Sequence, residues 1–449
     1  MFCDNVMRTG AWYGDRPLTL NFPDKWDVTF LWPNTPPPLK DSQIANLLEQ
    51  PTGQPPIREI CKGKSRPLII VDDLNRPTPA ARIMPFLLNH FRDAGIPLVD
   101  VRIIMGPAAH GLPPSDAMAK KVGPLAATSC KASVHDWTHN TVKIGTTSYG
   151  TPVFVNREVV ASDFVLGVGG IYPNDSAGFG GGSKLAIGVL GRRSIMRLHY
   201  GHRGAGWGAV DENDFRSDLN EIARMIRMNT MVALNVNAAR DVVRMGCGDP
   251  SQFYNAALAF SKEAFTAPFP GDADVVISNA YPNDLSLTFV RKKGTTPLRH
   301  CAPGASRIVI ASCTEGLGLH RLFPEVNLPR FYRERVIVRR LSVIKPAEIS
   351  DRILSRVRKK PPSIQPQTPL TRKNPLWLYH TGSNPEMLPA QIRGLTITRS
   401  WPEILRAIQR EQGERENLKV LVFPCAPLQC LEGITPEELL ARNSLQAIS

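Results

Sequence analysis

A strand–turn–helix–strand pattern between residues 67 and 106 limits the possible fold more than any other feature of this chain. The stretch "PLIIV" at 67–71 is short, apolar and partly β-branched, which is typical of a buried parallel strand, and two aspartates follow it. The stretch "NRPTPAARIMPFLLNHFRDAG" at 75–95 predicts a helix after a turn, with Pro77 and Pro79 near its start, where proline is tolerated. The stretch "VDVRIIMG" at 99–106 predicts the next strand. This β–α–β unit predicts a doubly wound, mostly parallel α/β sheet.

The same alternation continues along the first half of the chain. Residues 113–123 predict a short helix capped by Ser115 or Asp116, and residues 151–171 predict a strand, a polar turn and a buried strand, "DFVLGVGGI". Residues 218–228 and 251–265 predict amphipathic helices. Ligands of open α/β sheets bind at the carboxyl ends of the strands. We therefore expect "VDDLNRP" at 71–77 and "GFGGGSK" at 178–184 to lie beside a ligand.

The proline- and glycine-rich stretch "TAPFPGDA" at 266–273 predicts a domain boundary, which divides the chain into residues 1–267 and 268–449. After it, residues 274–284 and 306–318 each predict a strand that ends in a polar loop, so a second α/β domain is expected. Residues 1–60 predict irregular structure with short strands. The pattern weakens after residue 345, until "KVLVFP" at 419–424 predicts one late strand.

Charge and cysteine usage limit the classes of partner. The chain has a net charge of +14, and residues 330–373 hold 13 Lys or Arg against 3 acids. Because no nucleic-acid motif or interleaved aromatic residues accompany this segment, we favour a solvated basic face or loop over a nucleic-acid site. No apolar run is long enough for a transmembrane helix, and no secretory signal is visible. The eight scattered cysteines indicate reduced thiols in a cytoplasmic protein.

The stretch "NDSAGFGGGSKLAIG" at 174–188 places a lysine directly after a glycine run. It does not match the Walker pattern, because Leu185 follows Lys184, and it does not contain GxGxxG. Consecutive glycines let backbone N–H groups approach an anion, and the lysine adds a charge or a nucleophilic amine. Taken alone, the loop leaves phosphate binding and a plain turn both open.

Histidines supply further candidates, although a structural role is the default for each one. His110 lies in "MGPAAHGLPP", just past a predicted strand, and His199 and His202 lie in "SIMRLHYGH". His135 and His139 have the spacing of a helical metal site. Because their neighbours indicate a polar loop, we predict no site there.

Taken together, the spaced motifs resemble the nickel-dependent lactate racemase family over almost the whole chain, most strongly between about residues 10 and 320. The stretches that carry the resemblance are "DDLNRPTPA", "GPAAHG", "GTTSYGTPVFVNREVVASDFVLGVGGIYPNDSAGFGGGSKLAI", "SIMRLH", "GDP" at 248–250, "AYPNDLSL" and "TEGLG". The resemblance implies an active site in the cleft between two α/β domains.

The resemblance implies a nickel-pincer nucleotide, pyridinium-3,5-bisthiocarboxylic acid mononucleotide, tethered to Lys184 through a thioamide. Its sulfur, carbon and sulfur atoms would bind Ni(II), and His199 would complete a square plane, a geometry that suits this metal. One residue fewer separates His199 from the lysine than the family pattern leads us to expect. The expected cofactor-binding residues are Asp73, Arg76, Gly181, Gly182 and Lys184, with Asn75 in place of the usual threonine.

The implied reaction is the racemisation or epimerisation of an α-hydroxy acid. His110 matches the family's first catalytic histidine, but the position of the second is occupied by Asn174, which is not a base near neutral pH. Three consequences stay open. Another group serves as second base, or Asn174 hydrogen-bonds the substrate of an epimerase, or the activity is lost or altered.

The substrate side departs from the family as well. Lys292 falls near the family's lysine, whereas Thr288 and Phe289 occupy its Tyr-Gln positions, so we expect a 2-hydroxy acid bulkier than lactate. The expected partners are this small molecule and the enzymes that mature the cofactor, with no nucleic acid and no membrane. Two alternatives remain: a sugar-acid epimerase or hydride-transfer enzyme with the same cofactor, and a catalytically silent nucleotide-binding homologue.

Overall fold

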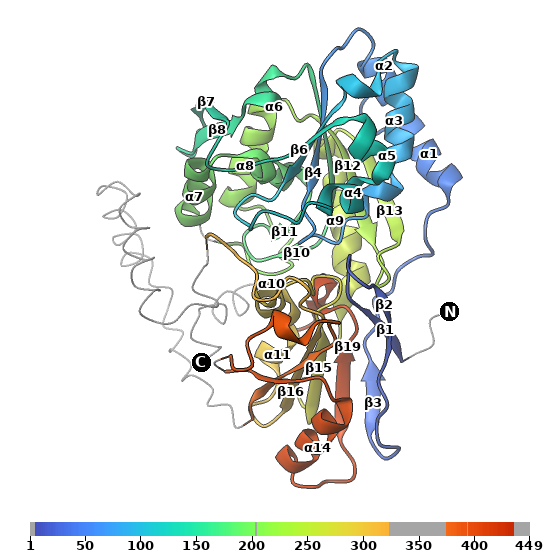
Figure 1. The fold of residues 1–449 in the computed structure, drawn as a ribbon, viewed down its shortest axis with the longest axis vertical. Coiled ribbons are helices and arrows are strands. Elements are labelled where there is room, and N and C mark those ends of the chain that lie inside the picture. Colours follow the sequence, from blue (N-terminus) through green and yellow to red (C-terminus); the bar gives the residue numbers. More distant parts are fainter. Residues whose placement is uncertain (1–4, 203, 323–373, 393, 435–449) are drawn as a thin grey trace, which may run out of the picture.

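The computed structural model describes residues 5–202, 204–322, 374–392 and 394–434, and two six-stranded sheets organise this part of the chain (Figure 1). The first sheet has the order β13–β12–β9–β4–β5–β6. Its neighbouring strands are parallel except for β12 and β13. The strands are β4 (Pro67–Asp72), β5 (Arg102–Gly106), β6 (Lys131–Val134), β9 (Phe164–Gly170), β12 (Thr230–Val236) and β13 (Val242–Gly248).

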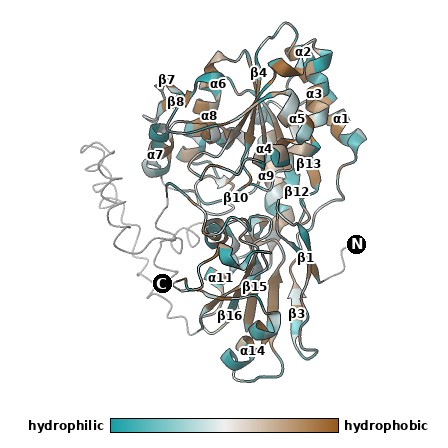
Figure 2. Ribbon diagram, viewed as in Figure 1, coloured by the Kyte–Doolittle hydropathy of each residue, from teal (hydrophilic) through white to brown (hydrophobic). Residues whose placement is uncertain are grey.

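Helices cover both faces of the first sheet, which explains why β4 is apolar along its whole length. Leu68 and Ile70 belong to the core on one face, which also includes residues of α7 (Arg192–Gly201) and α8 (Asp214–Met225). Ile69 and Val71 belong to the core on the other face, which also includes residues of α1 (Asp41–Glu49) and α3 (Met84–Asp93). Figure 2 shows brown along the central strands and teal on the outer helices and loops. The doubly wound, mostly parallel α/β sheet predicted from the sequence is confirmed.

The second sheet has the order β18–β17–β16–β15–β19–β3, and all its neighbouring strands are parallel. Its strands are β3 (Asp27–Phe30), β15 (Val275–Asn279), β16 (Ser306–Ala311), β17 (Leu376–His380), β18 (Thr396–Thr398) and β19 (Lys419–Phe423). Figure 1 shows the blue β3 beside the red β19 in the lower half of the molecule. The predicted division at residues 267 and 268 stays a prediction, and β3 pairs across it.

Smaller elements lie outside the two six-stranded sheets. Hairpins form between β1 and β2, between β7 and β8, and between β10 and β11, while β14 pairs with β20. The remaining described strands are β1 (Val6–Thr9), β2 (Arg16–Thr19), β7 (Thr141–Thr146), β8 (Pro152–Asn156), β10 (Pro173–Asn174), β11 (Gly178–Phe179), β14 (Thr266–Ala267) and β20 (Cys430–Leu431). The remaining described α-helices are α2 (Ile57–Ile60), α4 (Ala117–Val122), α5 (Pro124–Ser129), α6 (Arg157–Ala161), α9 (Pro250–Phe265), α10 (Leu287–Phe289), α11 (Thr296–His300) and α14 (Trp401–Glu411). The other helical segments are the 3₁₀ helix η3 (Gly182–Val189), the π-helical turn η4 (Val290–Gly294) and the short 3₁₀ turns η1 (Ala80–Arg82), η2 (Leu98–Asp100), η6 (Pro385–Met387) and η7 (Ala426–Leu428).

The structure corrects several local predictions. The helix predicted within 75–95 begins only at Met84, because Pro77 and Pro79 belong to a loop and Pro85 occupies its first turn. The polar turn predicted after β8 is the short helix α6, whose first turn is capped by the Asn156 side chain. Residues 1–60 contain α1 as well as short strands, and residues 374–411 contain β17, β18 and α14 in addition to the late strand β19.

Two other predictions concern side chains and membranes. The seven cysteines of the described residues are buried and unbridged. No helix of the described segments is both long and apolar enough to cross a membrane. The basic segment 330–373 lies outside the described residues.

Candidate active site

One pocket is lined by loops that follow the carboxyl ends of strands from both sheets. The first sheet contributes loops after β4, β5 and β9, and the second sheet contributes loops after β15 and β16. Eight of the predicted site residues line this pocket: Asp73, Arg76, His110, Asn174, Gly181, Lys184, His199 and Lys292. Strand ends in α/β sheets bring together loops that are distant in sequence, so this is the expected place for a ligand.

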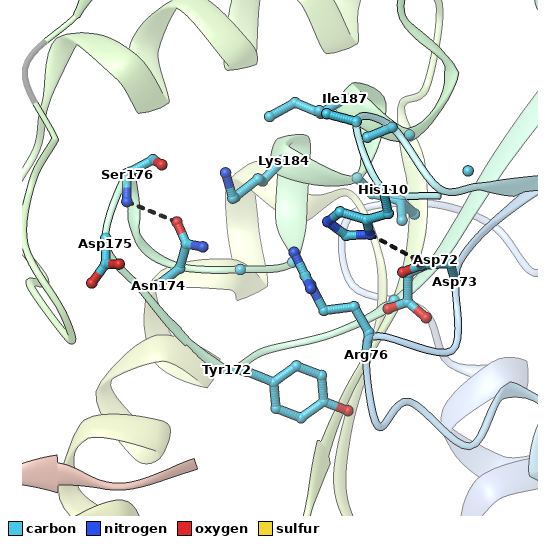
Figure 3. Close-up of a pocket in the computed structure, with 18 of the residues that line it drawn as sticks. Asp72, Asp73, Arg76, His110, Tyr172, Asn174, Asp175, Ser176, Lys184 and Ile187 are labelled. Atoms are coloured by element: carbon cyan, nitrogen blue, oxygen red, sulfur yellow. Dashed lines mark hydrogen bonds and ion pairs between the residues drawn. The ribbon is translucent and has the colours of Figure 1, made fainter. Parts of the chain in front are cut away.

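Asp73 and His110 form a buried pair on the pocket wall (Figure 3). His110 Nδ1 lies 2.7 Å from Asp73 Oδ2. Burial opposes ionisation of Asp73, but His110 and Arg76 outweigh it and lower the pKa of this carboxyl to about 2. Burial lowers the pKa of His110, against the charge of Asp73. Because an ionised carboxylate only accepts, Nδ1–H donates to Asp73 and the lone pair of a neutral ring lies on Nε2, as a general base requires.

A buried lysine, which the sequence reasoning missed, supports the loop that carries Asp73 and Arg76. The side chain of Lys121 is fully buried. Its ammonium donates to Asp72 Oδ1 at 2.8 Å, to the Arg76 carbonyl at 3.0 Å and to the Thr78 carbonyl at 3.1 Å. All three ammonium donors are therefore used within one loop, which limits its freedom.

Lys184 lies in η3 with its amine in the pocket, next to Asn174 and His110 in Figure 3. Its Nζ lies 4.7 Å from the centre of the Phe215 ring. Burial, together with the charges of Arg216 and Arg76, lowers the pKa of Lys184 well below its usual range. A lowered pKa makes the amine more available as a nucleophile, which suits a covalent anchor better than a phosphate clamp.

The glycine loop before Lys184 has a conformation that side chains resist. Gly181 and Gly182 have φ angles of 71° and 56°, and a Cβ on Gly182 would lie 2.8 Å from the Tyr254 ring. Arg216 donates to the Gly181 carbonyl at 2.9 Å, and the Tyr254 hydroxyl donates to the Gly180 carbonyl at 2.8 Å. Gly182 is not among the lining residues, so these contacts support a turn role for it, whereas Gly181 lines the pocket.

Of the two histidines in "SIMRLHYGH", the structure brings His199 to the pocket. Its Nδ1–H donates to the Ile195 carbonyl at 2.9 Å on α7, so the lone pair of the neutral ring lies on Nε2. Burial and the charge of Lys184 lower the pKa of His199 to about 3. His202 instead lies 2.7 Å from Asp218 Oδ2, away from the lining residues.

His135 and His139 lie in the expected loop between β6 and β7. His135 is buried with its Nε2 3.0 Å from the Leu190 carbonyl, and His139 lies 3.2 Å from Asp136. Within the described ranges, no group of three or more His, Cys, Asp or Glu residues is arranged to hold a metal ion.

Asn174 lines the pocket, but its side-chain oxygen is used by the backbone. This oxygen accepts the N–H groups of Ser176 at 2.9 Å and Ala177 at 3.2 Å (Figure 3). The side chain therefore closes a local turn of the β10–β11 hairpin. The next residue, Asp175, also lines the pocket.

Two further pocket residues, Lys293 and His320, were missed from the sequence. Lys292 and Lys293 are consecutive in η4, a π-helical turn of the kind often found at functional sites, and both line the pocket. His320 follows the quoted "TEGLG" by two residues, but a lone histidine carries no signal of its own. Burial and the charge of Arg76 lower the pKa of Lys293 well below its usual range.

Comparisons with known proteins find similarity to lactate racemases. Residues 13–208 match the family model described as the lactate racemase N-terminal domain. A lactate racemase of Thermoanaerobacterium thermosaccharolyticum is 24% identical over 325 residues, which are 70% of this chain and 76% of the relative. This chain is therefore similar to lactate racemases, most directly to their N-terminal domain.

A second relative and two solved structures extend the likeness. A lactate racemase of Lactiplantibacillus plantarum is 25% identical over 306 residues, 66% of this chain and 72% of the relative. The structure of the lactate racemase apoprotein of T. thermosaccharolyticum has a TM-score of 0.69 at 21% identity, covering 95% of this chain and all of that chain. A Thermotoga maritima protein has a TM-score of 0.57 at 15% identity, covering 89% of this chain and all of that one. These structures share the fold.

The matched family domain divides the pocket. Asp73, His110, Asn174, Lys184 and His199 lie inside residues 13–208. The remaining pocket wall lies outside it and consists of Phe289, Lys292, Lys293, His320 and Leu322. This second wall of the pocket is therefore not part of the matched domain.

Proposed function

We propose that this protein is a racemase or epimerase of an α-hydroxy acid and uses a nickel-pincer nucleotide tethered to Lys184. One observation carries the proposal: a half-buried lysine of lowered pKa, a neutral histidine and an Asp–His pair line the same pocket in a fold similar to that of lactate racemase. The relatives named lactate racemase are isomerases, which supports the same class of reaction here.

The residues present fit this cofactor. Lys184 offers a neutral amine for the thioamide, and His199 offers one imidazole nitrogen, which is what a pincer with three donors of its own leaves to the protein. Arg76 is suited to a phosphate, and Gly181 brings backbone close to it. The bound cofactor would supply a reversible hydride acceptor.

The chain's own residues would do the proton chemistry. His110 Nε2 takes the substrate's hydroxyl proton, while Asp73 holds the ring in the tautomer that leaves this nitrogen basic. Lys292, which lines the pocket on the loop after β15, would bind the substrate carboxylate. The walls of the pocket keep this exchange away from bulk water, since Asp73 and His110 are both buried.

The substrate pocket favours an acid larger than lactate. Phe289 lies with its ring centre 4.7 Å from that of His110, and Thr288 donates its hydroxyl to the Leu317 carbonyl at 2.8 Å. The apolar ring of Phe289 and the Thr288 hydroxyl, which is already hydrogen-bonded, thus occupy the positions where the family pattern has two polar side chains. We expect a 2-hydroxy acid with a bulkier, less polar side chain, acted on in the cytoplasm.

The turn made by Asn174 favours one alternative, a nucleotide-binding homologue without racemase activity, since this position lacks a base. Such a protein would carry the cofactor and leave enantiopure acids unchanged. A sugar-acid epimerase with the same cofactor would instead act on polyhydroxylated acids.

Co-expression with the enzymes that make the nickel-pincer nucleotide tests the proposal. We expect an increase of intact mass that maps to Lys184, with about one nickel per chain. Lys184→Ala should lose the mass increase, His199→Ala should keep it and lose nickel, and Lys120→Ala should match the wild type. Loaded protein should then racemise an acid from a 2-hydroxy acid panel. An unmodified Lys184 beside a lactate racemase loaded in the same cells would contradict the proposal.

A further inference from the structure

The site lacks a base at Asn174, the position where the family pattern has a second catalytic histidine. The side-chain oxygen of Asn174 is bound to two backbone N–H groups, and an amide does not take up a proton near neutral pH. Interconversion of two enantiomers needs a proton acceptor for the hydroxyl of each. Three histidines line the pocket, and the proposed function assigns roles to His110 and His199 but none to His320.

The backbone fixes His320 beside His110. The two residues form an antiparallel bridge between the loop after β5 and the loop after β16. Gly111 N donates to the Leu319 carbonyl at 3.2 Å, and Arg321 N donates to the Ala109 carbonyl at 2.8 Å. The positions of the two histidines are therefore coupled by main-chain hydrogen bonds on both sides of the bridge.

The rings of this bridge form part of the pocket wall. The ring centres of His110 and His320 are 5.2 Å apart with planes at 61°, and Phe289 contacts both, at 4.7 Å and 6.0 Å. His320 is 8% exposed, and burial with the charge of Lys292 keeps its pKa well below the usual range. A neutral imidazole at a pocket wall can accept a proton.

Two neighbouring bases suit an inversion of configuration at the α-carbon in which the substrate carboxylate keeps its position. If a lysine holds the carboxylate and the α-hydrogen points at the hydride acceptor, the two enantiomers exchange the positions of hydroxyl and side chain. The hydroxyl then moves to the neighbouring substituent position of the same carbon, on the same side of the pocket. Two imidazoles side by side can each serve one of these positions.

We propose that His320 is the second acid–base group, acting on the hydroxyl of one enantiomer while His110 acts on that of the other; this rests on the proposed function. In each direction one ring would take the hydroxyl proton while the bound cofactor would supply the acceptor for the α-hydrogen and its electron pair, so that the C–O bond becomes a carbonyl. The proton would then pass from the first ring to the other, directly or through solvent. The other ring would return it to the oxygen as the hydride is restored to the opposite face of the carbon, so that both rings end neutral, as they began.

A single-turnover experiment separates the two roles. Loaded protein is mixed with one pure enantiomer, quenched, and assayed for the 2-keto acid by derivatisation. We expect His320→Gln to lose about 100-fold or more of the rate for one enantiomer and to keep the other, and His110→Gln to show the opposite preference. His135→Gln, which removes a buried histidine outside the pocket, should oxidise both enantiomers at wild-type rates.

A second readout does not need the cofactor. Calorimetry on the cofactor-free protein should show that His320→Gln weakens binding of one enantiomer about threefold to tenfold and leaves the other unchanged. His320→Asn provides an independent variant if the glutamine protein folds poorly. Equal losses for both enantiomers, or none, would overturn the assignment. Wild-type protein that carries the adduct but forms no keto acid from any acid would overturn the proposed function, and the assignment with it.

Discussion

At the scale of single residues, Asn174 has a structural use at the position where the family pattern leads us to expect a catalytic histidine. Its side chain closes a turn through Ser176 and Ala177 and carries no base. The identity of the residue was readable from the sequence. Its hydrogen bonds were not, because they depend on how the β10–β11 hairpin folds.

Replacing Asn174 should therefore affect stability more than chemistry. Asn174→Ala loses two hydrogen bonds, so we expect a loss of about 1 kcal/mol in the free energy of unfolding and less than a tenfold loss of racemisation rate. Urea denaturation and a chiral assay measure both. Asn174→Asp, which keeps an acceptor for the turn, is the control for stability. A fall of 100-fold or more in a folded Asn174→Ala protein would show that this side chain takes part in the reaction.

The neighbouring residues Lys121 and Lys120 differ in burial, so the same substitution at each should affect stability differently. Lys121 is fully buried on Asp72, whereas Lys120 lies 3.5 Å from Asp116 at the surface. Lys121→Met leaves the Asp72 carboxylate without its ammonium partner, so we expect a loss of about 3 kcal/mol in the free energy of unfolding. Lys120→Met should change it by less than about 0.5 kcal/mol. Equal urea midpoints for the two variants would contradict the supporting role of Lys121.

At the scale of elements, the contact between β5 and η3 places Lys184. Gly106 at the end of β5 meets Gly188 in η3, and a Cβ on Gly106 would lie 2.5 Å from the Gly188 Cα. Backbone atoms cannot yield as a flexible side chain can. The absence of side chains at this crossing therefore lets the lysine-bearing helix lie directly on the sheet.

Gly106→Ala should displace η3 and lower stability. We expect a loss of about 2 kcal/mol in the free energy of unfolding, together with reduced cofactor attachment at Lys184. Gly304→Ala is the matched control, because nothing lies within 4 Å of its Cβ position. Urea denaturation and intact mass measure the two effects. A Gly106→Ala protein with wild-type stability and full attachment would contradict the close approach.

Strands were predicted correctly from the sequence where a short segment is apolar, and therefore buried, along its whole length. The cores of β4, β5, β9, β15, β16 and β19 were each predicted from apolar runs. The helix α6 was missed because five residues are too few to show a helical period. The pairing of β3 with β19 has no local signal, since the two strands lie far apart in the sequence.

At the scale of the whole molecule, buried histidines should make stability depend on pH. Burial lowers the pKa of six described histidines: His90, His110, His135, His199, His320 and His380. Below their ordinary pKa of 6.5, the unfolded chain binds protons that the folded chain does not. The contribution of these histidines to the free energy of unfolding is therefore largest above pH 6.5 and is lost as the pH falls below that value.

We expect the urea midpoint of the cofactor-free protein to drop steadily between about pH 7.5 and 5.5. His135→Gln, which removes one contributor outside the pocket, should reduce the slope. Asp73 adds a separate loss at lower pH, because its folded pKa of about 2 lies below its ordinary value of 3.8. A midpoint that stays level or rises on acidification would contradict this account.

The order of residues determined the local properties of this protein. Apolar runs determined which segments are buried strands, and polar residues at the ends of those strands indicated where a ligand binds. Lys184, His110 and His199 could be picked out because their neighbours in the sequence form recognisable motifs. These features depend on residues close together in the chain, and a linear pattern records them directly.

Only the tertiary structure decided which side chains meet. It turned His199 rather than His202 into the pocket, placed Lys121 beneath Arg76, and set His320 beside His110 across a backbone bridge. Each of these contacts joins side chains from different elements, through the packing of helices on a sheet or of one sheet's loops on the other's. Periodicity reports whether a residue is buried, but its partner across the pocket depends on how the two sheets are packed together.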